Sequence, residues 1–136
     1  MRNPRFFRGV FLVAAVYDLV LGVVFLFLYP WAYAALGIPS PTEPAYLQLA
    51  AAFVLVQGIM YVLVYRNLEG NRDLILVGAI YKAAYAAISL FHLGLGDLPH
   101  PTFALFGVLD LGFLALFVMC LRAMGPPSVR GTAVPT

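Results

Sequence analysis

Four apolar stretches, each about as long as a membrane-crossing helix, take up most of this chain. They cover residues 10–29, 46–65, 74–93 and 102–121, and a helix needs roughly 20 apolar residues to cross the hydrocarbon core of a bilayer. Only 10% of the residues are charged and the mean hydropathy is +0.95, whereas about a quarter of the residues of a soluble domain are charged. The pattern predicts an all-α, polytopic membrane protein: an antiparallel four-helix transmembrane bundle over residues 1–124, with no separate soluble domain.

The first stretch has some features of a secretory signal. Arg2, Arg5 and Arg8 precede it, and Ala32-Tyr33-Ala34 is similar to a small-residue cleavage site. However, the apolar run exceeds the roughly 7–15 residues of a signal core and contains Asp18. We therefore expect the first helix to remain in the protein.

The arginines predict the orientation in the membrane. They lie before the first stretch, between the second and third, and after the fourth, while residues 30–45 and 94–101 contain no Lys or Arg. Loops on the cytoplasmic side are enriched in these residues, so both termini are expected in the cytoplasm. Scattered arginines form no basic stripe of the kind that binds nucleic acid, and no nucleic-acid partner is predicted.

The connections differ in stiffness. Four prolines between residues 30 and 44 predict a stiff, extended first outer loop, because proline fixes its own φ and disfavours helix in the residue before it. Residues 67–72 and 94–99 are short enough to close helical hairpins. Residues 125–136 show no apolar periodicity and are expected to form a flexible cytoplasmic tail.

Each apolar stretch contains a strongly polar residue near its middle: Asp18, Gln57, Lys82 and Asp110. At a rise of about 1.5 Å per residue, these positions fall at one depth near the centre of the bilayer. Charges at that depth usually face the bundle interior or a polar cavity and mark functional sites. We expect the four side chains to form a shared polar layer that serves as a ligand-binding or relay site.

Tyrosines and glycines accompany these polar residues. Tyr17 and Tyr81 directly precede Asp18 and Lys82, while Tyr61 and Tyr85 follow Gln57 and Lys82 by one helical turn. The tyrosines are therefore candidate members of the site. Small residues, which let membrane helices approach closely, flank the charges at Gly22, Gly78 and Gly107. In the last stretch, a pocket wall or ordinary core and lipid contacts would both explain Phe103, Phe106, Phe113 and Phe117.

Two carboxyls and one ammonium leave a surplus negative charge in this layer. A buried, unpaired carboxylate is expensive and usually takes up a proton instead. We expect one of Asp18 and Asp110 to pair with Lys82, and the other to be protonated or to reach water.

Other candidate sites are weaker. His92, Asp97 and His100 have no recognisable metal-ligand spacing, and no metal site is predicted. Cys120 is the only cysteine, so it can form no internal disulfide and is expected to be a packing residue. No motif for nucleophilic, phosphate-binding or redox chemistry is present; no catalytic residue and no cofactor are assigned.

A set of short motifs resembles small bacterial inner-membrane proteins of the DoxX-like type. The resemblance rests on the sequence YDLVLG at residues 17–22, Gln57-Gly58 with Tyr61, Lys82 with Tyr85, and Asp110-Leu111. It implies a four-helix architecture in the bacterial inner membrane. Some members of that group are membrane subunits associated with sulfur-compound oxidation and quinone reduction, but this chain lacks a redox-centre pattern, so only the architecture is carried over.

Two classes of function are compatible with the polar layer. A third interpretation is purely structural: the buried charges fix the register of the helices. In the first, the chain is a binding or accessory protein that contacts membrane lipid, holds a quinone or isoprenoid head group, or supports a larger membrane complex. In the second, it is a small proton- or ion-coupled transporter or channel that acts as a homo-oligomer; four short helices leave little room for alternating access, which favours the first class. Enzyme chemistry on a lipid by an Asp/Lys pair has no motif to support it.

Overall fold

The protein is all-helical over residues 1–127, the part of the chain that the computed structural model describes, and no strand occurs there. Four long helices dominate: α1 (Pro4–Phe27), α3 (Pro44–Arg66), α4 (Arg72–Leu95) and α5 (Pro101–Met124). All four are long and apolar enough to cross a membrane. A short α2 (Tyr29–Ala35) follows α1, and a 3₁₀ turn, η1 (Glu69–Asn71), joins α3 to α4. The expected tail lies largely outside the described residues.

Three of the four long helices begin ahead of the ranges expected from hydropathy, because a proline lies in their first turn. Pro4, Pro44 and Pro101 occupy the first turn of α1, α3 and α5, where the missing N–H costs nothing and the fixed φ suits a helix. Pro30 likewise lies in the first turn of α2. The expectation of an extended loop over residues 30–45 is therefore wrong for its first part, which is helical up to Ala35.

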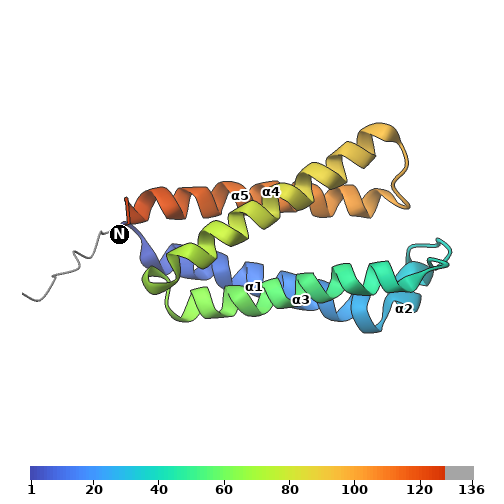
Figure 1. Ribbon diagram of the computed structural model, residues 1–136, viewed down its shortest axis with the longest axis horizontal. Coiled ribbons are helices and arrows are strands. Elements are labelled where there is room, and N and C mark those ends of the chain that lie inside the picture. The colour runs from blue at the N-terminus through green and yellow to red at the C-terminus, as the bar shows by residue number, and fades with distance from the viewer. Residues whose placement is uncertain (128–136) are drawn as a thin grey trace, which may run out of the picture.

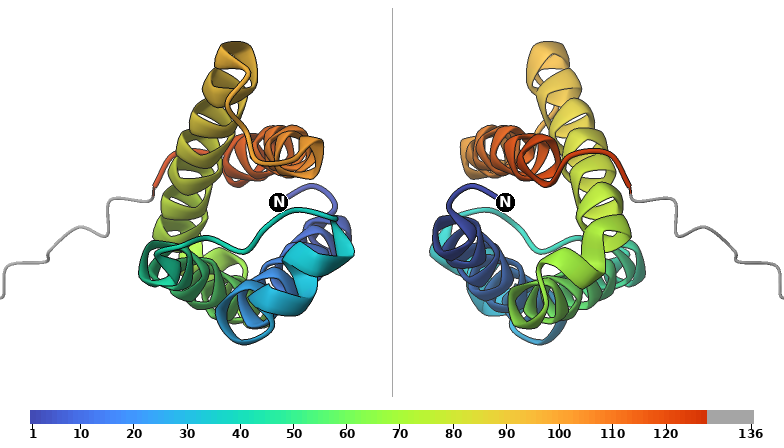
Figure 2. Two further views of the ribbon diagram at one scale, coloured as in Figure 1. Left: turned by 90° about the vertical axis from the view of Figure 1, so that its right-hand side faces the viewer. Right: turned by 90° about the vertical axis from the view of Figure 1, so that its left-hand side faces the viewer.

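The long helices form two closely packed pairs. α1 packs along α3 and α4 packs along α5, while contacts between the two pairs are sparse. The start of α1, the η1 turn and the end of α5 lie at one end of the molecule, and α2 lies at the other (Figure 1). Toward the α2 end, α4 and α5 diverge from α1 and α3 (Figure 1). Seen from that end, the segment between α2 and α3 crosses the space between the pairs (Figure 2, left).

The apolar core fills the half of the molecule near η1. Its fully buried side chains include Phe11, Val64, Ile75, Phe117 and Cys120. Cys120 is a buried packing residue, as the sequence predicted. Contacts from arginines close this end: Arg8 Nε donates to the Tyr65 carbonyl at 3.0 Å, and an Arg72 Nη atom donates to the Gly125 carbonyl at 3.4 Å. The other half, toward α2, contains a cavity that all four long helices line.

Candidate functional site

Lys82 lies between two aspartates at the centre of the molecule. Its Nζ is 2.8 and 3.1 Å from the two carboxylate oxygens of Asp18 and 2.8 Å from Oδ1 of Asp110. The three residues come from α4, α1 and α5 and expose only 1%, 1% and 3% of their surface, respectively. The expectation that Lys82 pairs with just one aspartate is therefore wrong. Lys82 can bridge both aspartates because its ammonium carries three donors.

Glycines allow the backbones near these charges to approach closely. A Cβ added at Gly22 would lie 2.8 Å from the Leu55 backbone, and one added at Gly58 would lie 2.8 Å from Leu19. These positions bring α1 and α3 together just beyond Asp18. On the other pair, a Cβ at Gly107 would lie 2.8 Å from the Ser89 hydroxyl, which donates to the Phe103 carbonyl at 2.6 Å. Close packing within each pair thus fixes the helices that carry the charged residues.

Aromatic rings surround the Lys82 ammonium. The centres of the Tyr17, Phe113, Tyr61 and Tyr81 rings lie 5.2, 5.3, 5.6 and 5.9 Å from Nζ, respectively. Cations within about 6 Å of a ring centre are attracted by the ring quadrupole. Tyr61 is fully buried and also packs against Phe11 and Phe117. It therefore separates the charged residues from the apolar core near η1.

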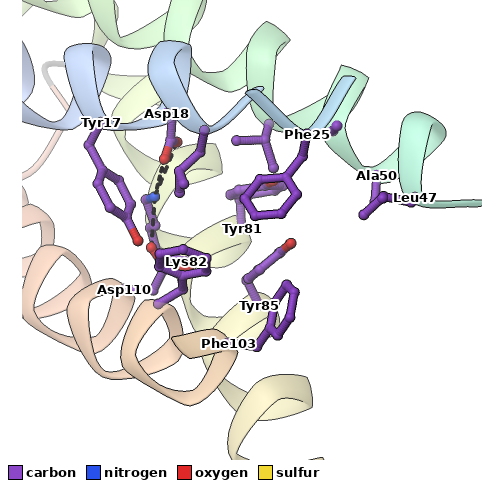
Figure 3. A pocket seen from close by; sticks show the side chains of 14 residues that line it. Tyr17, Asp18, Phe25, Leu47, Ala50, Tyr81, Lys82, Tyr85, Phe103 and Asp110 are labelled. Atoms are coloured by element: carbon purple, nitrogen blue, oxygen red, sulfur yellow. Dashed lines mark hydrogen bonds and ion pairs between the residues drawn. The ribbon is translucent and has the colours of Figure 1, made fainter. Parts of the chain in front are cut away.

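A cavity of about 50 Å³ lies next to the charged residues, on the side toward α2. A single water needs roughly 10–15 Å³ of such space, so several waters or a small polar head would fit. All four long helices line it (Figure 3): Tyr17, Asp18, Leu21, Phe25, Leu47, Ala50, Ala51, Val54, Tyr81, Lys82, Tyr85, Phe103, Phe106 and Asp110.

The two ends of this cavity differ in chemistry. Carboxylates and tyrosines line the end at Lys82, and aliphatic side chains with the Phe25 and Phe103 rings line the end toward α2 (Figure 3). The hydroxyls of Tyr17 and Tyr81 are buried and have no hydrogen-bond partner among residues 1–127. Buried polar groups are normally satisfied. Both tyrosines line the cavity, so their unpaired hydroxyls lie beside the space that a polar group would occupy.

The structure places the predicted site residues unequally. Asp18, Lys82, Asp110, Tyr17, Tyr81 and Tyr85 all line the cavity. Tyr61 contacts the ammonium from the opposite side. Gln57 does not line the cavity, and its Oε1 has no hydrogen-bond partner within the described part of the chain.

The phenylalanines of α5 divide between two environments. Phe103 and Phe106 line the cavity, whereas Phe117 belongs to the apolar core. The α3 residues Leu47, Ala50, Ala51 and Val54 were not among the predicted site residues. They form part of the wall, but nothing in an apolar sequence distinguishes a wall position from a lipid-facing one.

The two histidines near the α4–α5 connection contact different residues and do not form one site. His92 Nδ1 lies 2.8 Å from an Asp97 carboxylate oxygen on the surface. His100 precedes α5, and its Nδ1 accepts a hydrogen bond from the Thr102 N–H at 3.2 Å. No group of three or more metal-ligating side chains occurs within residues 1–127.

Comparison with protein-family models, with curated proteins and with solved structures gave no match for this chain.

Proposed function

We propose that this chain is a multi-pass membrane protein that binds the polar head of a lipid-soluble molecule in the cavity beside Lys82. One observation carries the proposal: the cavity has a charged end and an apolar, aromatic end, and it lies between helices that can span a bilayer. Ligand cavities are typically apolar with a few convergent polar groups that fix orientation. A polar head would contact the charged end, and its chain would extend along the apolar walls.

The surface supports a location in the membrane. Large apolar side chains are exposed along all four long helices, among them Val16, Phe53, Ile80 and Leu105, and contiguous exposed apolar surface marks interaction sites. We propose an antiparallel transmembrane bundle in a bacterial inner membrane, where lipid covers these side chains. A relationship to DoxX-like proteins is part of this proposal and rests on the sequence motifs alone.

The distribution of charge supports an orientation with both termini in the cytoplasm. The described arginines belong to the first turns of α1, the α3–α4 connection and the last turn of α5, all at the end of the molecule opposite α2 (Figure 1). The α2 end carries the acidic residues Glu43 and Asp97 and no Lys or Arg. Cytoplasmic loops carry the excess of Lys and Arg.

A proton- or ion-coupled transporter is the second candidate. The observation that favours it is the contact of one ammonium with two carboxylates, an arrangement that can exchange a proton. Proteoliposomes separate the two functions. A flux of protons or ions that the Asp18→Asn substitution abolishes would support transport. If the protein binds ligand but shows no such flux, the binding role is supported.

Native mass spectrometry of the protein extracted in mild detergent tests the binding role. We expect wild-type protein to carry a co-purified adduct with the mass of a lipid-soluble molecule. Ala51 is buried and lines the cavity, so Ala51→Leu should fill space and remove the adduct. Ala87→Leu on the exposed face of α4 is the matched control and should retain it. Wild-type protein without an adduct, or equal adducts in both variants, would contradict the proposal.

A further inference from the structure

The groups that line the cavity beside Lys82 indicate which chemical class of head group it would take. We infer that its ligand is an amphiphilic cation, meaning a protonated amine attached to an apolar chain. This inference rests on the proposed binding function and names the class of ligand. It follows from the charge balance of the site, from the donors and acceptors that remain available, and from the walls of the cavity.

The charged groups beside the cavity do not balance one another. Asp18, Asp110 and Lys82 are all buried, and among residues 1–127 no other Lys, Arg, Asp or Glu lines the cavity. With both carboxyls ionised, the three groups carry one surplus negative charge. A buried charge needs a partner. A cationic head would supply the missing positive charge, whereas an anionic head would add a second uncompensated negative charge.

The available hydrogen-bonding groups lead to the same class. A lysine ammonium has three donors, and three carboxylate oxygens lie within 3.1 Å of Nζ. Lys82 therefore has no donor left for an anionic head. One charged acceptor remains, because Oδ2 of Asp110 accepts no hydrogen bond from the described residues. The unpaired hydroxyls of Tyr17 and Tyr81 can each accept as well as donate. An ammonium, which only donates, matches this set.

The walls favour a cation as well. Tyr17, Tyr81, Tyr85, Phe103 and Phe106 line the cavity, so an ammonium placed near Asp110 is bordered by aromatic rings. The ring quadrupole attracts a cation, and the attraction is stronger where the cation is desolvated. The faces of the same rings repel the negative charge of a carboxylate or sulfonate.

The route for the apolar chain lies between α3 and α4. On the opposite side, between α1 and α5, aromatic contacts close the wall: Phe25 packs against Phe103 and Phe106, and Tyr33 of α2 packs against both Phe25 and Phe103. At the α3–α4 side, Ala50 and Tyr85 are exposed although they also line the cavity. A chain passing between them would leave the protein sideways, toward surrounding lipid.

Three amphiphiles with one chain and different heads test the inference: dodecylamine, dodecanol and dodecanesulfonate. Each is titrated calorimetrically into the protein in nanodiscs of phosphatidylcholine, with protein-free nanodiscs as the blank. Dodecylamine should bind saturably and about tenfold more tightly than dodecanol, a ratio that corresponds to about 1.4 kcal/mol. Dodecanesulfonate should show no saturable binding. Asp110→Asn should abolish the preference for the amine, and Asp97→Asn, which removes an exposed carboxylate, should preserve it.

The outcomes separate the two proposals. If none of the three amphiphiles binds saturably, the binding function itself fails. If dodecanol or dodecanesulfonate binds as tightly as dodecylamine, the binding function stands and the assignment of a cationic ligand is overturned. The comparison in the wild-type protein decides this point even if Asp110→Asn does not fold.

Discussion

Lys82 and Asp18 are 64 positions apart in the sequence, yet the ammonium of one contacts both carboxylate oxygens of the other, at 2.8 and 3.1 Å. The contact joins two helix pairs that otherwise touch sparsely, because Asp18 belongs to the α1–α3 pair and Lys82 to the α4–α5 pair. The contact between Lys82 and Asp110 lies within the second pair. Lys82 therefore links the halves of the molecule at the inner end of the cavity.

Removing this lysine should destabilise the protein strongly. Lys82→Met leaves Asp18 and Asp110 buried without a counter-charge, and breaking a buried ion pair in this way costs about 3–5 kcal/mol. We expect that loss in unfolding measured by circular dichroism in detergent. Arg5→Met, an exposed charge at the start of α1, is the control and should change stability by no more than about 0.5 kcal/mol. Equal stability of Lys82→Met and wild type would show that the carboxyls are not buried together.

Two glycines of α1 should respond oppositely to the same substitution. Gly22→Ala places a Cβ 2.8 Å from the Leu55 backbone, which must shift, whereas Gly9→Ala meets nothing within 4 Å. Overpacking costs about 1–3 kcal/mol, and an unhindered Gly to Ala change in a helix gains up to about 1 kcal/mol. Thermal unfolding of both variants checks this. A Gly22→Ala protein as stable as Gly9→Ala would contradict the close approach of α1 and α3.

A cation and a proton should compete for the surplus negative charge. The charged groups around Asp110 are Lys82 of α4 and Asp18 of α1, and the remaining polar neighbours are tyrosine hydroxyls. Infrared spectra of the ligand-free protein should show the carbonyl band of one protonated carboxyl, and dodecylamine should remove it. Binding of the amine should therefore release this proton, so it should weaken as the pH is lowered. Two ionised carboxylates in the ligand-free protein would exclude the competition.

A bulky residue at the α3–α4 side should slow access of the ligand. Ala50 is exposed and lines the cavity, so Ala50→Trp should reduce the association rate of dodecylamine at least severalfold. Ala84→Trp is the matched control, because Ala84 is exposed on α4 and does not line the cavity. Stopped-flow measurement in nanodiscs compares the two. Equal association rates would place the route elsewhere.

Cysteine labelling in intact cells should report the orientation. Ser40 lies exposed at the α2 end, and Glu69 lies exposed in the η1 turn at the other end. A membrane-impermeant maleimide should label Ser40→Cys and not Glu69→Cys, since the proposed orientation places the arginine-rich end in the cytoplasm. Cys120 is fully buried, so wild-type protein serves as the unlabelled control. The reverse labelling pattern would invert the topology.

The four long helices and the depth of the charged residues could be read from the sequence. Apolar runs of bilayer length admit little besides a helix, because every backbone polar group must be satisfied within the segment. Equal distances of Asp18, Lys82 and Asp110 from the ends of their stretches gave a common depth, and the three side chains do lie together. The missed element was α2, where Pro30 begins a helix instead of preventing one.

Which helices pack against each other could not be predicted from the sequence. All four long helices are apolar on nearly every face, so periodicity does not show which face meets which neighbour. Gln57 illustrates this, because its depth is similar to that of Asp18 but its side chain does not reach the cavity. The pairing of α1 with α3 depends on close contacts such as Gly22 with Leu55, which a hydropathy pattern does not show.

The place of Lys82 in the chain also constrains how the protein is made. A lone lysine at the centre of a bilayer helix costs about 2.5–3.5 kcal/mol during insertion, and α4 has no carboxylate of its own near that depth. Its bidentate partner Asp18 is on α1, which leaves the ribosome first. In the proposed transmembrane bundle, α1 therefore supplies a counter-ion for Lys82 before α4 is synthesised.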